Sequence, residues 1–518
     1  MDRYGLICRS ILESPGITQR ELAQILDVSL GTVNSLIKEC IHQGLISPSK
    51  DGSSLLELLP RGKELLEQYK VDGAVILAAG FGSRFVPLTF EMPKGLLEIF
   101  GERMIERQIR QLHEAGIYNI TIVVGYLKEK FEYLIDKYQV QLLYNPEYSC
   151  KNTLTSVYCA RHLLKSRNMY LLSSDNWLRS NMFHKYECGA WYSLCHTDGK
   201  TSEWCIQFNK KKVITGVQIG GENSWFMYGP VFLSANFSNL FLSVLEEYYQ
   251  IPGTEQFYWE HVFQEMVNGT AAKRLKENGS PFVAELSKAE RAAVMYANCQ
   301  PDDQVYEFEN LEELRRFDPK YQTHSNNQAL ELVAKVFQVD ESSIRNLRCL
   351  KAGMTNKSFL FDIEDKNYIC RIPGPGTELL INRYQEGEVY KAIASLGITE
   401  RIVYFNSDTG YKISRYYENS RTADARNLED MSQCMKLLRR FHESGITVNH
   451  DFDIKERIDF YEKLCRTHES ILFEDHKVVL EWMNQLIDKL ASMNRPKILC
   501  HIDSNADNFL MLENGGLV

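Results

Sequence analysis

The amino-acid sequence predicts a multidomain α/β protein built from three parts. A chain of 518 residues is too long for one hydrophobic core, and the usual domain size suggests about three domains. Residues 1–70 are predicted to form short helices, and residues 71–322 alternate strands with helices. Such alternation implies parallel strands joined by crossover helices. Residues 323–518 begin with a small antiparallel sheet and continue as helices, which predicts an α+β domain.

The composition is that of an ordinary soluble protein, with 44% hydrophobic and 25% charged residues. The net charge of −9 argues against a protein whose main role is to coat nucleic acid or an anionic membrane. No apolar run approaches the roughly 20 residues that span a bilayer, and the N-terminus lacks a signal-peptide core. The 13 cysteines include no CxxC pair and no zinc-type spacing, so we expect reduced thiols in a cytoplasmic protein.

Two helices are predicted near the N-terminus. The first spans Ile17–Leu26, where Thr18 as N-cap and Glu21 three residues later form a capping box. A hairpin tip at 49–54 and a further helix complete this part. The second helix follows a turn at 27–29; it is expected to expose Thr32, Asn34, Ser35 and Lys38 and to bury Val33, Leu36, Ile37, Cys40 and Ile41.

This arrangement resembles the winged helix-turn-helix domains of bacterial regulators. Members that bind DNA place the second helix in the major groove and add Lys and Arg side chains against the phosphates. Residues 1–70 hold eight Lys and Arg against nine Asp and Glu, so this part is slightly acidic. Two roles therefore stay open, DNA binding through residues 1–70 and a regulatory or protein-contact role.

A glycine-rich turn opens the second part directly after a buried strand at Ala74–Leu77. Small residues there let the main chain approach triphosphate oxygens with its N–H groups as donors. Arg84 is expected to neutralise the triphosphate and the charge that builds at the α-phosphate, and Lys94 supplies a second charge. The predicted nucleotide-binding residues are Leu77, Ala78, Ala79, Gly80, Gly82, Ser83, Arg84 and Lys94.

The pattern beyond this turn continues as strands and helices. Ligands of such sheets bind at the carboxyl ends of the strands. Asp175 follows the apolar strand Met169–Ser173 and is therefore a candidate site residue. The other expected elements are strands Ile120–Val124 and Leu142–Tyr144 and helices Met104–Ala115, Glu129–Lys137 and Thr153–Leu164.

The stretch LAAGFGSRFVPLTFEMPKGLLEIFGERMIERQI resembles the opening of the sugar-phosphate nucleotidyltransferases, which have a mostly parallel, Rossmann-like sheet. Together with NITIVVGYLKEKFEYL, LLYNPEY and YLLSSDNWL, it is most similar to bacterial CTP:phosphocholine cytidylyltransferases. The resemblance implies catalytic roles for Arg84, Lys94 and Asp175, with Asp175 holding Mg²⁺. It implies a second metal carboxylate after a strand at Val305, where the family usually has Asp and this chain has Glu309.

Two other carboxylates compete with Glu309. Strand alternation places Glu307 on the same face as Glu309, and Glu260 lies in a further stretch that resembles the family. The implied reaction is attack of the acceptor's phosphate on the α-phosphorus with release of pyrophosphate. A phosphomonoester is already mostly a dianion near neutral pH, so no dedicated general base is needed.

Aromatic residues are frequent between 191 and 260, which suits a quaternary ammonium because aromatic faces bind such cations. The candidates for the choline head group are Trp204, Tyr228 and Trp225. Aromatic residues in strands are more often core, so phosphoethanolamine and aminoethylphosphonate stay open as alternative acceptors. The predicted substrates are CTP and phosphocholine.

The third part carries the pattern HxDxxxxN at 501–508 and resembles bacterial choline kinases, which implies ATP and choline as ligands. Asp503 would orient the substrate hydroxyl, and Asn508 would help to hold magnesium. Arg371 stands where protein kinases keep a phosphate-binding lysine, with Glu386 or Glu388 as its partner. A nucleotide loop is expected at Lys351–Lys357.

The kinase resemblance also contains a departure. The family has a second metal-binding Asp after this loop, and the sequence ends at Val518 before reaching one. We therefore expect an incomplete α+β kinase-like domain with little kinase activity, either in a truncated piece of a longer enzyme or in a degenerate domain. A rival hypothesis is a winged-helix regulator whose enzyme-like domains sense choline metabolites.

Overall fold

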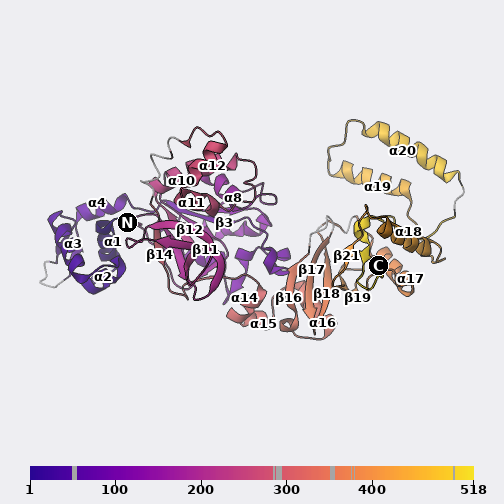
Figure 1. Cartoon of the computed structure of the whole chain (residues 1–518), viewed down its shortest axis with the longest axis horizontal. Helices are drawn as coiled ribbons and strands as arrows, with labels where there is room; N and C mark the ends of the chain where they lie inside the picture. The colour runs from indigo at the N-terminus through magenta and orange to yellow at the C-terminus, as the bar shows by residue number, and fades with distance from the viewer. Residues whose placement is uncertain are drawn as a thin grey trace. The chain divides into compact units, whose positions relative to one another are not determined.

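The computed structural model describes residues 1–49, 55–283, 286, 294–350, 356–374, 376–377, 380–493 and 496–518. Contacts divide the chain into two compact units, Met1–Gln322 and Thr323–Val518 (Figure 1). No helix among the described residues is both long enough and apolar enough to cross a membrane.

The N-terminal part of the first unit has the predicted winged-helix arrangement. The Thr18 hydroxyl accepts the N–H of Glu21 at 3.2 Å, and Glu21 accepts the N–H of Thr18 at 2.7 Å, so the predicted capping box is confirmed. Ile41 was expected inside and is 38% exposed, because the buried stripe of its helix follows Val33, Ile37 and Cys40. Residues 50–54 of the expected hairpin tip lie outside the described residues. The elements are α1 (Arg3–Glu13), α2 (Gln19–Leu26), α3 (Leu30–His42), β1 (Ile46–Pro48), β2 (Leu56–Leu58) and α4 (Pro60–Glu67).

A mixed sheet forms the centre of the first unit, in the order β12-β11-β13-β8-β3-β6-β7. Strands β8, β3, β6 and β7 are parallel, as predicted, and β13, β11 and β12 extend the sheet as antiparallel strands. β10 pairs with both β13 and β14. The bounds are β3 (Gly73–Ala78), β6 (Ile120–Val124), β7 (Gln141–Tyr144), β8 (Met169–Ser173), β10 (Trp191–His196), β11 (Lys200–Phe208), β12 (Ile214–Glu222), β13 (Trp225–Leu233) and β14 (Tyr296–Cys299).

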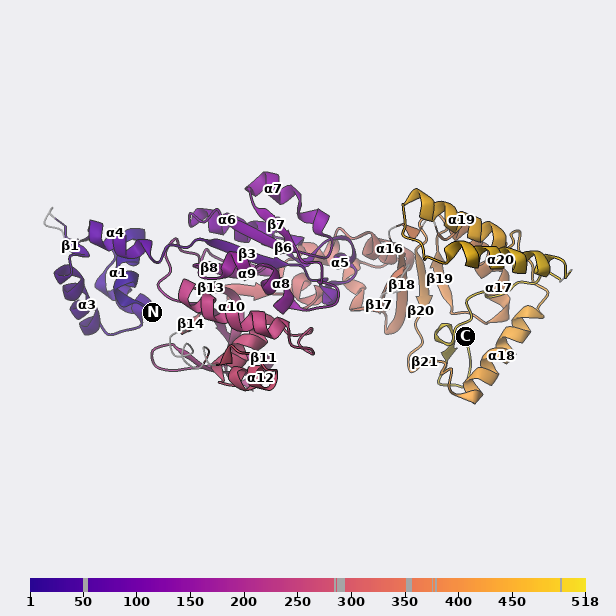
Figure 2. The same cartoon turned by 90° about the horizontal axis from the view of Figure 1, so that it is seen from above.

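Helices cover both faces of the parallel strands. Figure 2 shows α6 (Met104–Glu114) and α7 (Tyr133–Tyr138) on one side, and α8 (Thr153–Cys159) and α10 (Ala235–Tyr249) on the other. Two predicted helices are each broken into two pieces. A 3₁₀ turn at Lys128–Phe131 precedes α7, and a short helix α9 (Arg161–Leu164) follows α8. The two pieces α8 and α9 still share one buried face, because Leu154, Val157, Ala160 and Leu164 are buried in one hydrophobic cluster.

A buried ion pair joins the winged helix to this sheet. Arg9 of α1 donates to Glu187 Oε2 at 2.8 Å and to the carbonyl of Tyr186 at 3.1 Å. The other oxygen of Glu187 accepts the hydroxyl of Tyr170 at 2.6 Å. Tyr170 is fully buried within β8, so the N-terminal part is bonded to a central strand of the sheet.

The second unit begins with α16 (Gln328–Phe337) and an antiparallel sheet in the order β16-β17-β18-β20-β19. The three predicted strands are present as β16 (Arg345–Cys349), β17 (Asn356–Ile363) and β18 (Lys366–Pro373). Residues 351–355 of the expected nucleotide loop lie outside the described residues. The remaining elements are α17 (Arg383–Ile393), β19 (Ile402–Phe405), β20 (Lys412–Arg415), β21 (Arg421–Thr422), α18 (Leu428–His442), α19 (Ile454–Thr467), α20 (His476–Ala491) and β22 (Leu510–Met511).

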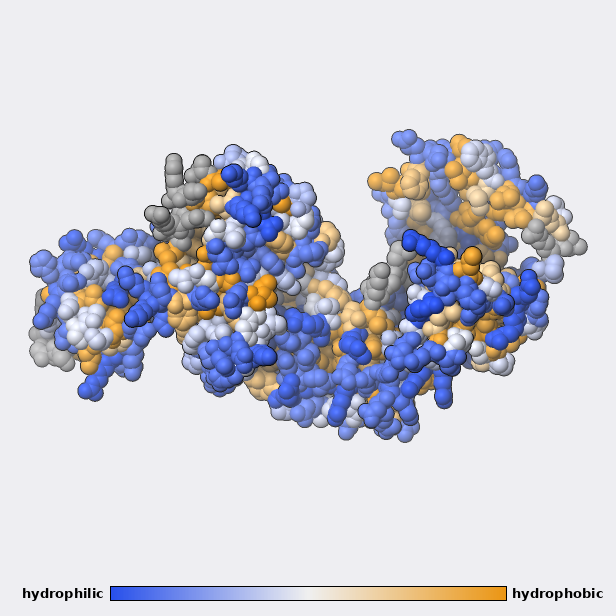
Figure 3. All heavy atoms as spheres, viewed as in Figure 1, coloured by the Kyte–Doolittle hydropathy of each residue, from blue (hydrophilic) through white to orange (hydrophobic). Residues whose placement is uncertain are grey.

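Helices α19 and α20 pack loosely in this unit. Both are described throughout, and neither contains a buried residue. Large apolar side chains stand on their surface, among them Trp482 and Leu486, which are 63% and 49% exposed. Figure 3 shows orange, hydrophobic atoms on the surface of this part of the chain. These helices therefore contribute little to a hydrophobic core.

Replacing Arg9 tests the contact between the winged helix and the sheet. Arg9→Met leaves the buried Glu187 carboxylate without its cation, which costs about 3 kcal/mol. We expect the free energy of unfolding of the first unit to fall by that amount, measured by urea denaturation with tryptophan fluorescence.

The matched control is Lys165→Met, because Lys165 pairs with Glu246 at 2.7 Å while both side chains are about one-third exposed. Such pairs contribute about 0.5 kcal/mol. An equally small loss for Arg9→Met would show that the Arg9–Glu187 pair does not hold the two parts together.

Candidate active site

The loop after β3 has the shape that the glycine-rich motif predicts. A Cβ at Gly80 would meet no atom within 4 Å, so the space above this residue is open. Gly82 has a φ of 67°, in the region that favours glycine, and its carbonyl accepts the hydroxyl of Thr89 at 3.0 Å. The loop therefore leaves room for a ligand to approach its main chain.

Lys94 and Asp175 form an ion pair at the carboxyl end of β8. Lys94 Nζ lies 2.7 Å from Asp175 Oδ2, and the two side chains are 12% and 21% exposed. Burial favours the neutral carboxyl group, but the Lys94 ammonium outweighs this effect and holds the pKa of Asp175 below its usual value. Asp175 is therefore a carboxylate at neutral pH.

Two main-chain contacts hold this ion pair in place. A Cβ at Gly95 would lie 2.6 Å from Ser174 Oγ, so the loop that carries Lys94 packs directly on the turn that carries Asp175. On the other side, the Gln108 amide donates to the carbonyls of Ser173 and Asn176 at 2.8 and 2.7 Å. The turn around Asp175 is thus fixed from α6 and from the Lys94 loop.

Arg84 lies at the rim of the site. Its Nη1 is 3.9 Å from Glu309 Oε1, and the side chains are 67% and 57% exposed. The alternation argument that placed Glu309 beside Glu307 was wrong, because β15 (Val305–Glu307) ends before Glu309. Arg84 and Glu309 form a solvent-exposed pair.

Glu307 is the carboxylate that lies close to Asp175. Burial, followed by the negative charge of Asp175, raises the pKa of Glu307 to about 7. Its side chain accepts the Asn176 amide at 3.2 Å. The hydroxyl of Tyr228 accepts the N–H of Glu307 at 2.7 Å and donates to its carbonyl at 2.9 Å. Tyr228 therefore positions Glu307.

These carboxylates suit Mg²⁺ in the company of a substrate. Among the described residues, no group of three or more His, Cys, Asp or Glu side chains is arranged to hold a metal ion. Mg²⁺ is usually bound by one or two carboxylates together with waters and substrate phosphates. Asp175 with Glu307 provides such a set, and Glu309 lies farther out on Arg84.

The buried hydroxyl of Tyr192 contacts one carboxylate. Glu260 Oε1 accepts this hydroxyl at 3.4 Å, and Glu260 Oε2 is enclosed without a hydrogen-bond partner among the described residues. Burial raises the pKa of Glu260 to about 8. Burial and then the charges of Glu260, Glu307 and Glu203 raise the pKa of Tyr192 well above its usual value. The surroundings of this phenol are therefore acidic.

Aromatic rings line the same region. Tyr192 stacks on Trp259 with ring centroids 5.7 Å apart, and Trp204 lies edge-on to His261 at 4.6 Å. The pairing of β11 with β12 shifts register between Thr201 and Trp204, so Glu203 lies in an irregular part of the strand. Burial, followed by the charge of Glu309, raises the pKa of Glu203.

The other two predicted substrate residues have structural contacts. Trp225 is half-buried, packs against a cluster of buried hydrophobic residues, and its ring lies 5.2 Å from the ring of His196. Tyr228 packs against another such cluster, and its hydroxyl is hydrogen-bonded to the main chain of Glu307. Sequence reasoning counted Tyr192 among the aromatic candidates for the head group without selecting it, and it gave no role to Gln108. No sequence signal marks Gln108, which lies on a helix distant from β8 in the chain.

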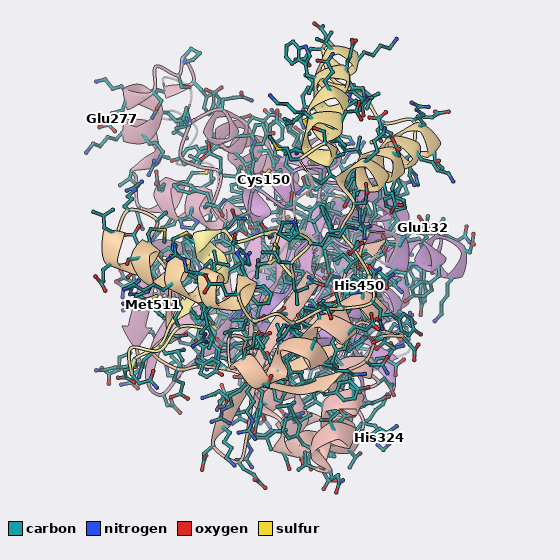
Figure 4. All side chains as sticks on the ribbon, turned by 90° about the vertical axis from the view of Figure 1, so that its right-hand side faces the viewer. Glu132, Cys150, Glu277, His324, His450 and Met511 are labelled. Atoms are coloured by element: carbon teal, nitrogen blue, oxygen red, sulfur yellow. The ribbon has the colours of Figure 1, made fainter. Side chains whose placement is uncertain are left out.

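The kinase-like residues form two groups in the second unit. Arg371 lies 2.6 Å from Glu386, and Glu388, the alternative partner, lies 3.2 Å from His450 Nδ1 (His450 is labelled in Figure 4). Asn508 donates to the carbonyl of Asp503 at 2.7 Å and to its Oδ2 at 3.2 Å.

Three separate parts of the chain match known protein families. Residues 73–187 match the family of nucleotidyl transferases, residues 7–47 match winged helix-turn-helix DNA-binding domains, and residues 346–518 match the phosphotransferase enzyme family.

Two curated relatives are cytidylyltransferases. The choline-phosphate cytidylyltransferase of Streptococcus pneumoniae is 31% identical over 194 residues, which span 38% of this chain and 84% of that protein. The 2-aminoethylphosphonate cytidylyltransferase of Lancefieldella rimae is 33% identical over 191 residues, 36% of this chain and 78% of that protein. Among solved structures, the choline kinase LicA from Streptococcus pneumoniae is 27% identical, with a TM-score of 0.33, over 36% of this chain and 64% of that one.

Removing the Asp175 carboxylate should abolish nucleotidyl transfer. We expect Asp175→Ala to lower kcat at least about 10³-fold, because positive charge at the phosphates is the main source of rate enhancement in such a site. Glu307→Gln should lower kcat about tenfold or more, and Glu309→Gln less than about threefold, because the exposed pair is screened by solvent. Pyrophosphate release measures all three.

Asp303→Ala is the control, since Asp303 pairs with Arg179 at 3.3 Å on the surface and should keep full activity. Near-normal turnover by Asp175→Ala would remove this residue from the reaction. A larger loss for Glu309→Gln than for Glu307→Gln would restore Glu309 as the second carboxylate.

Proposed function

Because the chain belongs to the cytidylyltransferases of the nucleotidyl transferase family, we propose that it transfers CMP from CTP to phosphocholine, giving CDP-choline and pyrophosphate. The choice of cytosine and of choline rests on the two named cytidylyltransferases, one named for choline phosphate and the other for 2-aminoethylphosphonate. The observation that carries the amine class is the enclosed Glu260 carboxylate on the hydroxyl of Tyr192.

The residues at the end of β3 and β8 support this reaction. The N–H groups of the loop 79–83 would bind triphosphate oxygens, and Arg84 and Lys94 would neutralise the charge that develops on the α-phosphate. Asp175, with Glu307, would hold a magnesium ion, which supplies positive charge to the triphosphate when bound.

Transfer needs positioning more than proton chemistry. A phosphate oxygen of the acceptor attacks the α-phosphorus, the bond to the bridging oxygen breaks, and pyrophosphate leaves. The acceptor phosphate is already ionised, so its approach in line with the leaving group is what the site must arrange. The contacts of Gly95 with Ser174 and of Gln108 with the Ser173 carbonyl hold Lys94 and Asp175 in fixed positions, which suits such alignment.

The head group of the acceptor would lie near Tyr192, Trp204 and Glu260. A quaternary ammonium forms no conventional hydrogen bond, so it is held by aromatic faces and negative charge. Burial raises the pKa values of Glu203 and Glu260, so neither carboxyl group is readily ionised by its own surroundings. A cation bound beside them would favour their ionised forms.

The second candidate acceptor is 2-aminoethylphosphonate or phosphoethanolamine. Glu260 Oε2 is an enclosed acceptor without a hydrogen-bond partner among the described residues, and a primary ammonium could donate to it. The choice between the two head groups is therefore a choice between aromatic contact and hydrogen bonding.

The flanking parts supply further proposals. The kinase-like unit would bind ATP and choline through the Arg371–Glu386 pair and the loop of Asp503 and Asn508. The winged helix would contact DNA or another protein through α3, whose residues Asn34, Ser35 and Lys38 are exposed.

A matrix of substrates tests the proposed reaction. Pyrophosphate release is measured with CTP, UTP, dTTP or ATP, each combined with phosphocholine, phosphoethanolamine or 2-aminoethylphosphonate. We expect CTP with phosphocholine to give the highest kcat/KM, by at least about tenfold, which corresponds to about 1.4 kcal/mol. Product from the primary amines without product from phosphocholine would contradict the choline assignment.

The pH dependence of acceptor binding tests Glu260. Its pKa of about 8 means that it is mostly protonated at pH 7, and a bound cation favours the carboxylate. Binding therefore releases a proton, and KM for phosphocholine should fall roughly five- to tenfold between pH 7.0 and 8.5, about the change in the carboxylate fraction.

Glu260→Gln removes this titration, so its KM should be raised and nearly independent of pH. Glu255→Gln is the matched control, since Glu255 is exposed in the same segment and should keep the wild-type pH profile. A wild-type KM that does not change over this pH range would argue against Glu260 beside the head group.

A further inference from the structure

Both cations expected to bind the triphosphate are paired with a carboxylate. Lys94 lies 2.7 Å from Asp175 with both side chains mostly buried, whereas Arg84 lies 3.9 Å from Glu309 in solvent. The two pairs have the same charges and different burial. Water screens the exposed pair strongly and the buried pair much less. Only the Lys94–Asp175 contact is therefore a strong constraint on what the site can bind.

The Lys94–Asp175 pair cannot relax by moving its main chain. Gly95 is packed against Ser174, and the Gln108 amide holds the carbonyls on both sides of the Asp175 turn. The Lys94 ammonium also lies 4.9 Å from the centre of the Phe85 ring. The ammonium can therefore leave Asp175 by rotation of the Lys94 side chain, while the main chain that carries Asp175 stays in place.

A triphosphate without metal would meet an unfavourable charge arrangement here. Drawing Lys94 toward the phosphates removes the ammonium that neutralises Asp175 and leaves that carboxylate beside several negative oxygens. Removing one partner of a largely buried ion pair is strongly unfavourable. Asp175 would instead hold a divalent cation that accompanies the nucleotide, and Lys94 would then be free to contact the phosphates.

We propose that the Lys94–Asp175 ion pair makes nucleotide binding conditional on a divalent cation, so that the site rejects a metal-free nucleoside triphosphate. This inference rests on the proposed nucleotide site and adds a selectivity role to Asp175. Asp175 acts as a metal ligand in the loaded site and as the counter-ion that withholds Lys94 in the free site. Lys94 exchanges one negative partner for another.

Calorimetric titration of CTP into the full-length protein, in EDTA or in Mg²⁺, measures this condition. For the wild type we expect Kd to be about 30-fold weaker in EDTA, which corresponds to about 2 kcal/mol. Asp175→Asn keeps the size of the side chain and frees Lys94, so its metal-free Kd should tighten about tenfold and its dependence on Mg²⁺ should fall below about threefold. Asp303→Asn is the control, because Asp303 pairs with Arg179 at 3.3 Å on the surface, and its metal-free Kd should change less than about threefold.

Lys94→Met provides an independent measurement. Without the ammonium, Asp175 is free to bind cations, so Mn²⁺ in the absence of nucleotide should bind about fivefold more tightly than to the wild type, as measured by electron paramagnetic resonance. Metal-free CTP binding by Asp175→Asn as weak as that of the wild type would overturn the proposal. Unchanged Mn²⁺ affinity in Lys94→Met would overturn it as well.

A failure of the proposed function gives a different result. If another nucleoside triphosphate binds and CTP does not, the assigned base is wrong, and the same variants titrated with that nucleotide still decide the role of the ion pair. If CTP binds with the expected metal dependence but phosphocholine yields no pyrophosphate, the acceptor is wrong and the ion-pair proposal is supported.

Discussion

Charge compensation along β8 is the constraint on which the first unit depends. Near the start of β8, the hydroxyl of Tyr170 is hydrogen-bonded to Glu187, which pairs with Arg9 of the winged-helix part. Just beyond the end of β8, Asp175 pairs with Lys94. Each buried carboxylate needs its cation, because an uncompensated buried charge is costly. The same strand therefore connects the N-terminal part to the candidate active site.

The carboxylates of the site differ in their surroundings, which separates their tasks. Asp175 stays ionised beside Lys94, whereas burial raises the pKa values of Glu307 and Glu260. Pairs of acidic groups with pKa values driven apart are typical of functional sites. The ionised group suits a metal ion that accompanies the phosphates, and the groups with raised pKa values gain most from a cationic ligand.

Much of the parallel sheet could be predicted from the sequence. Strands Ile120–Val124 and Met169–Ser173 agree with the prediction to the residue, because continuous apolar runs mark strands buried on both faces. The glycine-rich loop and Asp175 were identified because they follow such strands directly. Local pattern is sufficient where the site residues adjoin a buried strand.

The group formed by Glu203, Glu260 and Glu307 could not be predicted in the same way. These residues lie on β11, α11 (Trp259–Val267) and β15, which are far apart in the chain. Only the folded antiparallel part of the sheet brings these elements into one region, and no short-range sequence pattern predicts that. Glu309 was preferred over Glu307 because of the family resemblance, and the end of β15 at Glu307 removes only the expectation that both side chains share one face of a strand.

The buried Glu187 has a consequence for the history of this chain. A glutamate that is only 3% exposed is a liability in a transferase that lacks the winged helix, because Arg9 is part of that helix. Selection would then remove the acid whenever the two coding segments separate, and would keep it wherever they stay joined. An acidic residue at this position is thus expected to be inherited together with the N-terminal segment, as a mark of the fusion itself.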